Sequence, residues 1–241
     1  MATTTLESER IRANEIIALL RANLTIRNED FASVLIARES GDSFRVLVVT
    51  VLSQSCTDIA ALRAYRNLDK SIGVSVQELA QADVRRIQSA IRVAGLHRQK
   101  ARALKQMALL VSERYVGNLD AALDGPLEEA RGRLQELPKI GSKTADVLLS
   151  VWGRPTISVD THVDRISKRL GLTPHEAKYE EVRSGLMSLF REEDYRSIPL
   201  LFMAHGRRFC KSVRPLCPIC PVGGLCPYRR KTRRLRRSAS V

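Results

Sequence analysis

The chain has 241 residues, enough for one large domain or two modest ones around a sizeable core. Its formal net charge is +14, which predicts a polyanionic partner, and nucleic acid is favoured over a membrane surface. The sequence has no apolar run long enough to span a bilayer, and its N-terminus lacks the pattern of a secretory signal. We therefore expect no membrane association and a cytoplasmic, nucleoid-associated or nuclear location with reduced thiols.

Helical patterns account for most of the first half of the chain. The run over residues 44–52 is continuously apolar and β-branched, so its propensity favours a buried strand, although a buried helix has the same pattern. Ser75 and Glu78 form a capping-box pattern at a helix start. Helices are expected over residues 6–24, 59–68, 84–93 and 96–117, with a shorter apolar segment at 31–36.

The second half continues the helical pattern. Pro126 suits the first turn of a helix, Asp160 is expected to be an N-cap, and Thr173 with Glu176 forms a second capping-box pattern. The tail after Tyr228 is almost wholly basic and is predicted to be disordered. Helices are expected over residues 127–137, 142–152, 160–170, 174–190 and 198–209. About ten helices without a repeat of fixed period predict an all-α fold.

Residues 137–145 (LPKIGSKTA) end one helix and begin another. With Gly141 at the sharp point, the first backbone N–H groups of the second helix are left unpaired, and such groups bind phosphate. Lys139 and Lys143 add positive charge. The turn is therefore expected to position DNA without reading its base sequence, and an ordinary helix-turn-helix corner is the alternative. The expected contacts are Lys139, Ile140, Gly141 and Ser142.

Lys143 lies in the first turn of the second helix, where the helix dipole disfavours the ammonium form. Partial burial would act in the same direction. A lysine with a lowered pKa can act as a nucleophile and form a Schiff base. The alternatives are a solvated surface lysine at Lys143 and a simple helix cap at Asp160.

Four of the five cysteines fall within a short segment near the C-terminus, with the spacing Cys-x6-Cys-x2-Cys-x5-Cys. Without a secretory signal, such a cluster predicts a metal site and not a disulfide framework. Four thiolates can hold either zinc or an iron–sulfur cluster. The ligands are Cys210, Cys217, Cys220 and Cys226, and the basic residues expected to face phosphate nearby, or merely to be solvated, are Arg207, Arg208, Lys211 and Arg214.

These motifs together resemble the endonuclease III branch of the helix-hairpin-helix DNA glycosylases. The resemblance rests on LPKIGSKTA, on VDTH at residues 159–162 and on the cysteine spacing, and it extends from about residue 44 to 228. It implies a helix over residues 44–52 and a two-lobed fold. A six-helix barrel with the hairpin would cover residues 36–155. An iron–sulfur domain would combine residues 1–35 and 156–228, and residues 229–241 would form the tail.

The resemblance also implies a reaction and a cofactor. Lys143 would attack C1′ of the damaged nucleotide, Asp160 would assist it, and β-elimination would break the strand 3′ to the lesion. The substrates would be oxidised pyrimidines in duplex DNA, the cofactor a [4Fe–4S] cluster, and the protein a monomer. The alternatives are a monofunctional mismatch or uracil-type glycosylase and a non-catalytic DNA-binding iron–sulfur protein.

One hairpin position departs from the family pattern, and two loops have to be aligned with it. The family hairpin usually reads LPGVG, so Lys139 replaces its first glycine and the backbone geometry there is left open. The loop that fills the gap left by a flipped base corresponds to residues 52–58, where we expect Gln54 and Ser55 to act together. A second loop offers Leu96, beside His97, as an apolar wedge between bases, with a core leucine as the alternative.

Overall fold

The computed structural model describes residues 2–228, and the basic tail lies outside this range. The described residues form an all-α structure without strands, which confirms the predicted class. None of the described helices combines the length and the apolarity needed to cross a bilayer. The α-helices are α1 (Ala2–Asn23), α2 (Ala32–Ser40), α3 (Ser43–Ser53), α4 (Asp58–Ser71), α5 (Val76–Gln81), α6 (Val84–Ala90), α7 (His97–Tyr115), α8 (Asp120–Leu123), α9 (Leu127–Gln135), α10 (Ser142–Val151), α11 (Thr161–Leu170), α12 (Tyr179–Leu189) and α13 (Ser197–Arg208).

Two units divide the chain. One contains Arg27–Arg154, and the other contains Met1–Ile26 with Pro155–Val241. The first unit therefore carries the LPKIGSKTA hairpin and Lys143, and the second carries Asp160 and the four clustered cysteines. The domain boundaries expected at residues 36 and 155 stay a prediction.

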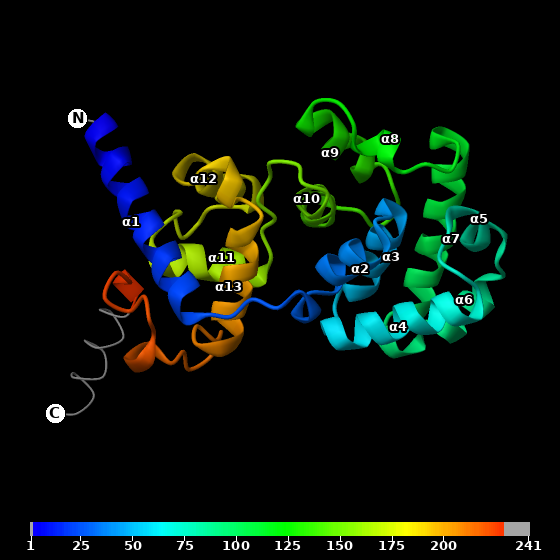
Figure 1. Ribbon diagram of the computed structural model, residues 1–241, viewed down its shortest axis with the longest axis horizontal. Coiled ribbons are helices and arrows are strands. Elements are labelled where there is room, and N and C mark those ends of the chain that lie inside the picture. The colour runs from blue at the N-terminus through cyan, green and yellow to red at the C-terminus, as the bar shows by residue number, and fades with distance from the viewer. Residues whose placement is uncertain (1, 229–241) are drawn as a thin grey trace. The chain divides into compact units, whose positions relative to one another are not determined.

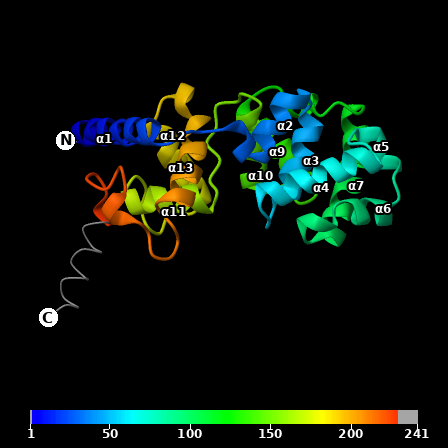
Figure 2. The same ribbon diagram turned by 60° about the horizontal axis from the view of Figure 1, so that its bottom comes forward.

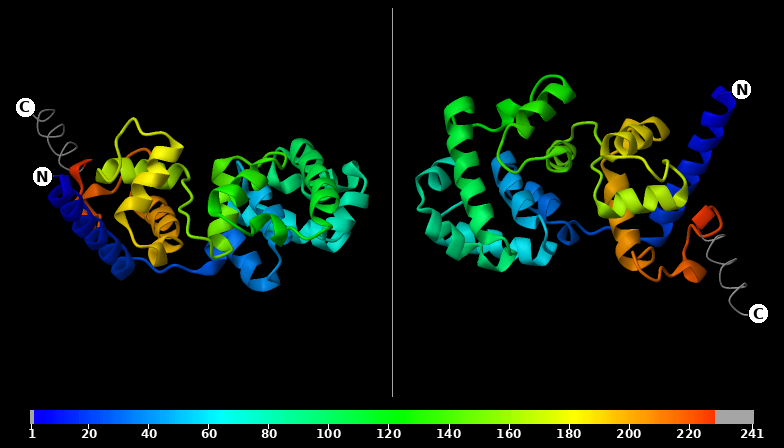
Figure 3. Two further views of the ribbon diagram at one scale, coloured as in Figure 1. Left: turned by 90° about the horizontal axis from the view of Figure 1, so that it is seen from above. Right: turned by 180° about the vertical axis from the view of Figure 1, so that it is seen from behind.

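Helix α3 is the centre of the unit Arg27–Arg154. It contacts α2, α4, α7 and α10, and nearly all of its side chains are buried. Figures 1 and 3 show α10 beside α2 and α3 on one side of this unit, while α5 and α6 lie against α7 on the other. The strand favoured by propensity over residues 44–52 is wrong, and the helix implied by the family resemblance is confirmed. A helix buried on all faces can use β-branched residues around its whole circumference.

The second unit packs α1, α11, α12 and α13 around its own core. Helix α1 contacts α12 and α13, so the N-terminal segment completes a core built by the C-terminal half (Figure 2). Fully buried members of this core include Ile16, Leu20, Ile166 and Phe202.

The expected caps have mixed outcomes. Asp160 caps α11, and Ser75 with Glu78 forms a capping box at α5. The second capping box, at Thr173 and Glu176, is wrong because α12 begins only at Tyr179. The hydroxyl of Thr173 is buried and donates a hydrogen bond to Ser167 Oγ at 3.2 Å, so it binds a neighbouring helix instead of a helix start.

Candidate functional site

The hairpin between α9 and α10 has the features of a phosphate site. Gly141 is the N-cap of α10, and no side chain caps the backbone N–H groups that follow. A Cβ atom added at Gly141 would meet nothing within 4 Å, so a ligand can approach the backbone there. The unpaired N–H groups and the helix dipole favour an anion at this point.

The sharp point of the hairpin lies at Lys139 and not at Gly141 as expected. Lys139 has a φ of 65°, in the left-handed region, whereas Gly141 is extended with a φ of −93°. The chain therefore makes the turn with a residue that carries a Cβ atom. Around it, Ile140 is buried, Ser142 is half-buried, and both Lys139 and Gly141 are exposed.

Lys143 is exposed in the first turn of α10. The partial burial expected from the sequence is therefore absent. The next residue, Thr144, is buried and anchors this turn of the helix in the unit. An exposed amine on an anchored helix start can reach a bound ligand.

Asp160 lies in the other unit as the N-cap of α11 and is half-buried. Its Oδ1 accepts backbone hydrogen bonds from His162 (2.9 Å) and Val163 (2.7 Å). The His162 ring lies 3.0 Å from Arg165 and so close to α13 that a Cβ atom on Gly206 would be 2.2 Å from its Nδ1. The side chain of His162 thus packs against α13, and its backbone N–H donates to Asp160.

The four clustered cysteines line one pocket in their unit. Burial raises the pKa of the Cys220 thiol to about 11, so this sulfur stays protonated unless a bound group stabilises the thiolate. Among the described residues, no His, Cys, Asp or Glu group is arranged as a ready site for a single metal ion. The other lining residues are Ile166, Arg169, Leu170, His205, Phe209, Pro215, Val222, Gly223 and Tyr228.

Two side chains beside the sulfurs were not predicted from the sequence. The Nε2 atom of His205 lies 3.7 Å from Cys220 Sγ, and burial lowers the His205 pKa to about 4. The Nη1 atom of Arg169 donates to Cys210 Sγ at 3.4 Å. His205 has no metal-ligand spacing and Arg169 is one of many arginines, so the sequence carried no signal for either.

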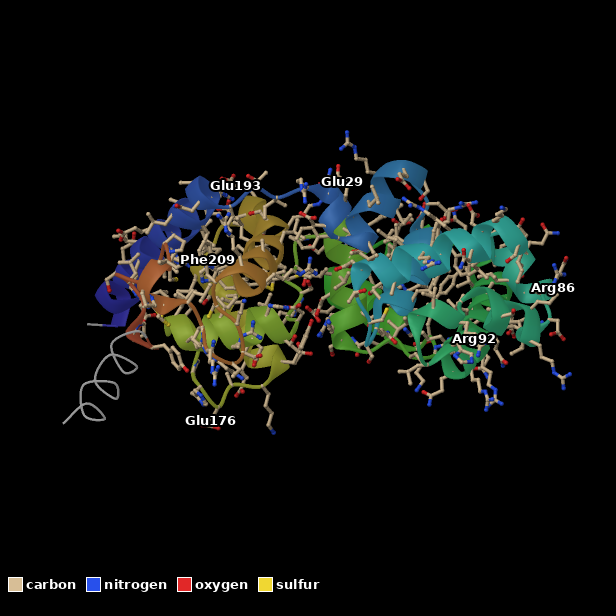
Figure 4. The ribbon with its side chains drawn as sticks, turned by 90° about the horizontal axis from the view of Figure 1, so that it is seen from below. Glu29, Arg86, Arg92, Glu176, Glu193 and Phe209 are labelled. Atoms are coloured by element: carbon tan, nitrogen blue, oxygen red, sulfur yellow. The ribbon has the colours of Figure 1, made fainter. Side chains whose placement is uncertain are left out.

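The expected basic residues surround the start of the cysteine segment. Figure 4 labels Phe209, at the C-cap of α13, from which this segment leaves the helix. Arg208 lies over the Phe209 ring, with its Cζ atom 5.0 Å from the ring centre. Arg207, Arg208, Lys211 and Arg214 are all exposed, as a phosphate-facing surface requires.

Comparison with known proteins settles the family. Residues 48–192 match the HhH-GPD superfamily of base excision DNA repair proteins. The chain belongs to this superfamily. Among curated relatives, endonuclease III of Sulfolobus acidocaldarius is 34% identical over 90% of this chain and 96% of its own length. Endonuclease III of Thermotoga maritima is 35% identical over 79% of this chain and 85% of its own.

Two solved structures have a fold similar to that of this chain. A trapped endonuclease III–DNA covalent intermediate is 32% identical, covers 79% of this chain and 86% of its own, and has a TM-score of 0.72. A thermostable thymine-DNA glycosylase reaches a TM-score of 0.71 at 20% identity, covering 96% of this chain and 100% of its own, and so shows the fold alone. The chain is an endonuclease III homologue, a DNA N-glycosylase and abasic-site lyase of base excision repair that binds damaged duplex DNA.

The two loops that the endonuclease III resemblance assigned to DNA both lie in the unit Arg27–Arg154. Leu96 is 54% exposed with a φ of 45°, so the alternative of a core leucine is wrong. His97 begins α7 and is half-buried. Ser55 is exposed with a φ of 57°, whereas Gln54 is half-buried. Two exposed loop tips in strained backbone conformations are thus present where the homologue is expected to meet DNA.

Lys100 connects these two loops of the endonuclease III homologue and was not foreseen. Its buried Nζ atom donates to the backbone oxygens of Leu52 (2.7 Å) and Ala94 (2.9 Å), each a few residues before a loop tip. Burial lowers the pKa of Lys100. No sequence pattern indicates this role, because a lysine near a helix start is ordinarily solvated.

Proposed function

We propose that this chain excises oxidised pyrimidines from duplex DNA and then cleaves the strand through an imine on Lys143. The observation that carries the proposal is the exposed Lys143 amine in the first turn of α10, directly after uncapped backbone N–H groups. A phosphate held at those N–H groups would fix a nucleotide beside the amine. The family match supports the same reaction class.

The proposed chemistry proceeds in four steps. The neutral Lys143 amine attacks C1′ of the damaged nucleotide, and the base departs with the bonding electrons and a proton. Loss of the ring oxygen from C1′ then leaves an imine between the sugar carbon and Nζ. The imine makes the C2′ proton acidic, so its removal expels the 3′ phosphate by β-elimination. Lys143 is afterwards released by hydrolysis of the imine.

Asp160 supplies the negative charge that this sequence of steps needs. We assign it two tasks: accepting the proton that Lys143 must lose before it attacks, and stabilising positive charge as the base leaves. One of its oxygens, Oδ1, is engaged by backbone N–H groups of α11. Those bonds fix the orientation of the carboxylate.

Access to C1′ requires the damaged nucleotide to leave the base stack. Flipping costs least for damaged, weakly stacked bases, which gives a physical basis for lesion selectivity. Ser55 would occupy the vacated space, and Leu96 would hold the neighbouring base step apart. The exposure and the strained backbones of Ser55 and Leu96 support these roles.

We assign a [4Fe–4S] cluster to Cys210, Cys217, Cys220 and Cys226. All four line one pocket, and their single short Cys-x2-Cys pair differs from the two short pairs usual in structural zinc sites. When bound, the cluster supplies a rigid covalent cross-link within the segment. It would hold the exposed arginines and lysine of this segment against DNA phosphate. Because the substrate is DNA, we place the protein in the compartment that contains the cell's DNA.

Borohydride trapping on a duplex with a thymine glycol or an abasic site tests the proposal. We expect a covalent complex with the wild type, none with Lys143→Ala, and an unchanged yield with the control Lys70→Ala, an exposed lysine on α4. An undiminished complex with Lys143→Ala would refute the lyase assignment. A product that keeps an intact abasic strand until alkali is added would indicate a monofunctional glycosylase.

The variant Asp160→Asn separates the two possible roles of Asp160. Asparagine is as good an N-cap as aspartate, so α11 should keep its start while the negative charge is lost. We expect the rate of trapping to fall about a hundredfold, within the range typical of general acid–base groups. A wild-type rate would show that Asp160 is only a helix cap.

A further inference from the structure

Gln54 connects two parts of the hairpin that are far from it in sequence. It is the C-cap of α3, and its Nε2 atom donates to the backbone oxygen of Lys139 at 3.1 Å and to Oγ1 of Thr144 at 3.2 Å. The orientation of the amide is unambiguous, because a carbonyl oxygen can only accept. One side chain therefore spans the hairpin from its sharp point to the first turn of α10.

The sharp point is where the hairpin most needs support. Lys139 adopts a φ of 65°, which glycine reaches freely but which is unfavourable for a residue with a Cβ atom. A strained conformation persists only when its surroundings hold it. The bond from Gln54 engages the carbonyl of that same residue, and its second bond engages Thr144, which is buried and adjacent to Lys143.

We propose that Gln54 is a positioning residue that holds the hairpin in its DNA-binding shape and compensates for a lysine at a position suited to glycine. It acts through Lys139 and Thr144 on the backbone N–H groups of α10 and on the placement of Lys143. This inference rests on the proposed function for its catalytic part. It also assigns the two loop residues different tasks, since Gln54 is engaged with the protein and the exposed Ser55 is left for the gap in the DNA.

The test is a double-mutant cycle read by affinity for a duplex with a tetrahydrofuran abasic-site analogue, which the enzyme can bind but not cleave. Gln54→Ala removes two hydrogen bonds and should weaken binding about tenfold. In a Lys139→Gly background the turn is unstrained, so the same change should cost less than about threefold. The matched background is Lys139→Ala, which also removes the lysine charge but keeps the strain, and there the cost should again be about tenfold.

Gln54→Glu adds a second, chemically different test. It preserves length but places a carboxylate opposite the Lys139 carbonyl, so it should bind the duplex at least as weakly as Gln54→Ala. Trp152, the sole tryptophan of the chain, lies at the C-cap of α10 and reports by fluorescence whether each variant is folded. Equal losses from Gln54→Ala in all three backgrounds, or wild-type affinity of Gln54→Glu, would overturn the proposal.

The trapping rate at saturating DNA separates this proposal from the proposed function. If wild type forms the imine, Gln54→Ala should lower that rate as well as the affinity, and the Lys139→Gly background should reduce both effects. If wild type binds the duplex but forms no imine, the lyase assignment fails while the binding cycle still decides the role of Gln54.

Discussion

The buried ion pair across the hairpin gives a prediction whose magnitude follows from the structure. Arg131 on α9 places its Nε atom 3.1 Å from Oδ1 and 3.2 Å from Oδ2 of Asp146 on α10. The Asp146 side chain is 0% exposed and that of Arg131 is 9% exposed. The pair therefore joins the two helices of the hairpin from inside the unit.

Arg131→Met should destabilise the unit Arg27–Arg154 by about 3 to 5 kcal/mol, the range for removing one partner of a buried pair. The cost arises because the fully buried Asp146 carboxylate loses the guanidinium that faces it. The ion pair of Arg131 with the 63% exposed Glu128, at 3.4 Å, adds little by comparison. The same substitution in an Asp146→Asn background should cost less than about 2 kcal/mol, because no charge is then stranded.

Urea unfolding followed by Trp152 fluorescence measures the free energy of unfolding, because Trp152 packs against the core of the same unit. All four members of the cycle must unfold with a common m-value for the comparison to hold. A cost of Arg131→Met below about 1 kcal/mol, or an equal cost in both backgrounds, would refute the reasoning that a stranded charge dominates.

Three further predictions concern other parts of the chain. Lys100→Met should destabilise the same unit by about 2 to 4 kcal/mol in urea unfolding, because two buried carbonyls lose their ammonium donor, and an unchanged midpoint would contradict this. Cys217→Ser should lower the bound iron measured per chain and weaken DNA affinity, whereas the control Cys56→Ser should keep full iron. Removing the residues after Tyr228 should reduce DNA affinity and its salt dependence without abolishing cleavage, and loss of all chemistry would contradict that expectation.

The sequence by itself determined the features that depend on neighbours along the chain. Asp160 as an N-cap and the capping box of Ser75 follow from side chains that bond to backbone groups two or three residues away. The hairpin was located by its Pro and Gly, and the four cysteines by their spacing. The family resemblance, which rests on these same local motifs, supplied the helical state of α3.

Only the tertiary structure decided the features that depend on partners distant in sequence. Propensity favoured a strand at α3, and burial on all faces overrides such a weak local preference. The sharp point of the hairpin lies at Lys139 and not at Gly141. Gln54, which is 85 residues away in the sequence, donates a hydrogen bond to the Lys139 carbonyl. Lys100 and the pair of Arg131 with Asp146 are ionic groups that can be buried because the fold brings hydrogen-bonding partners from distant positions in the sequence into contact with them. A sequence pattern cannot contain such roles, since each belongs to a contact and not to a residue.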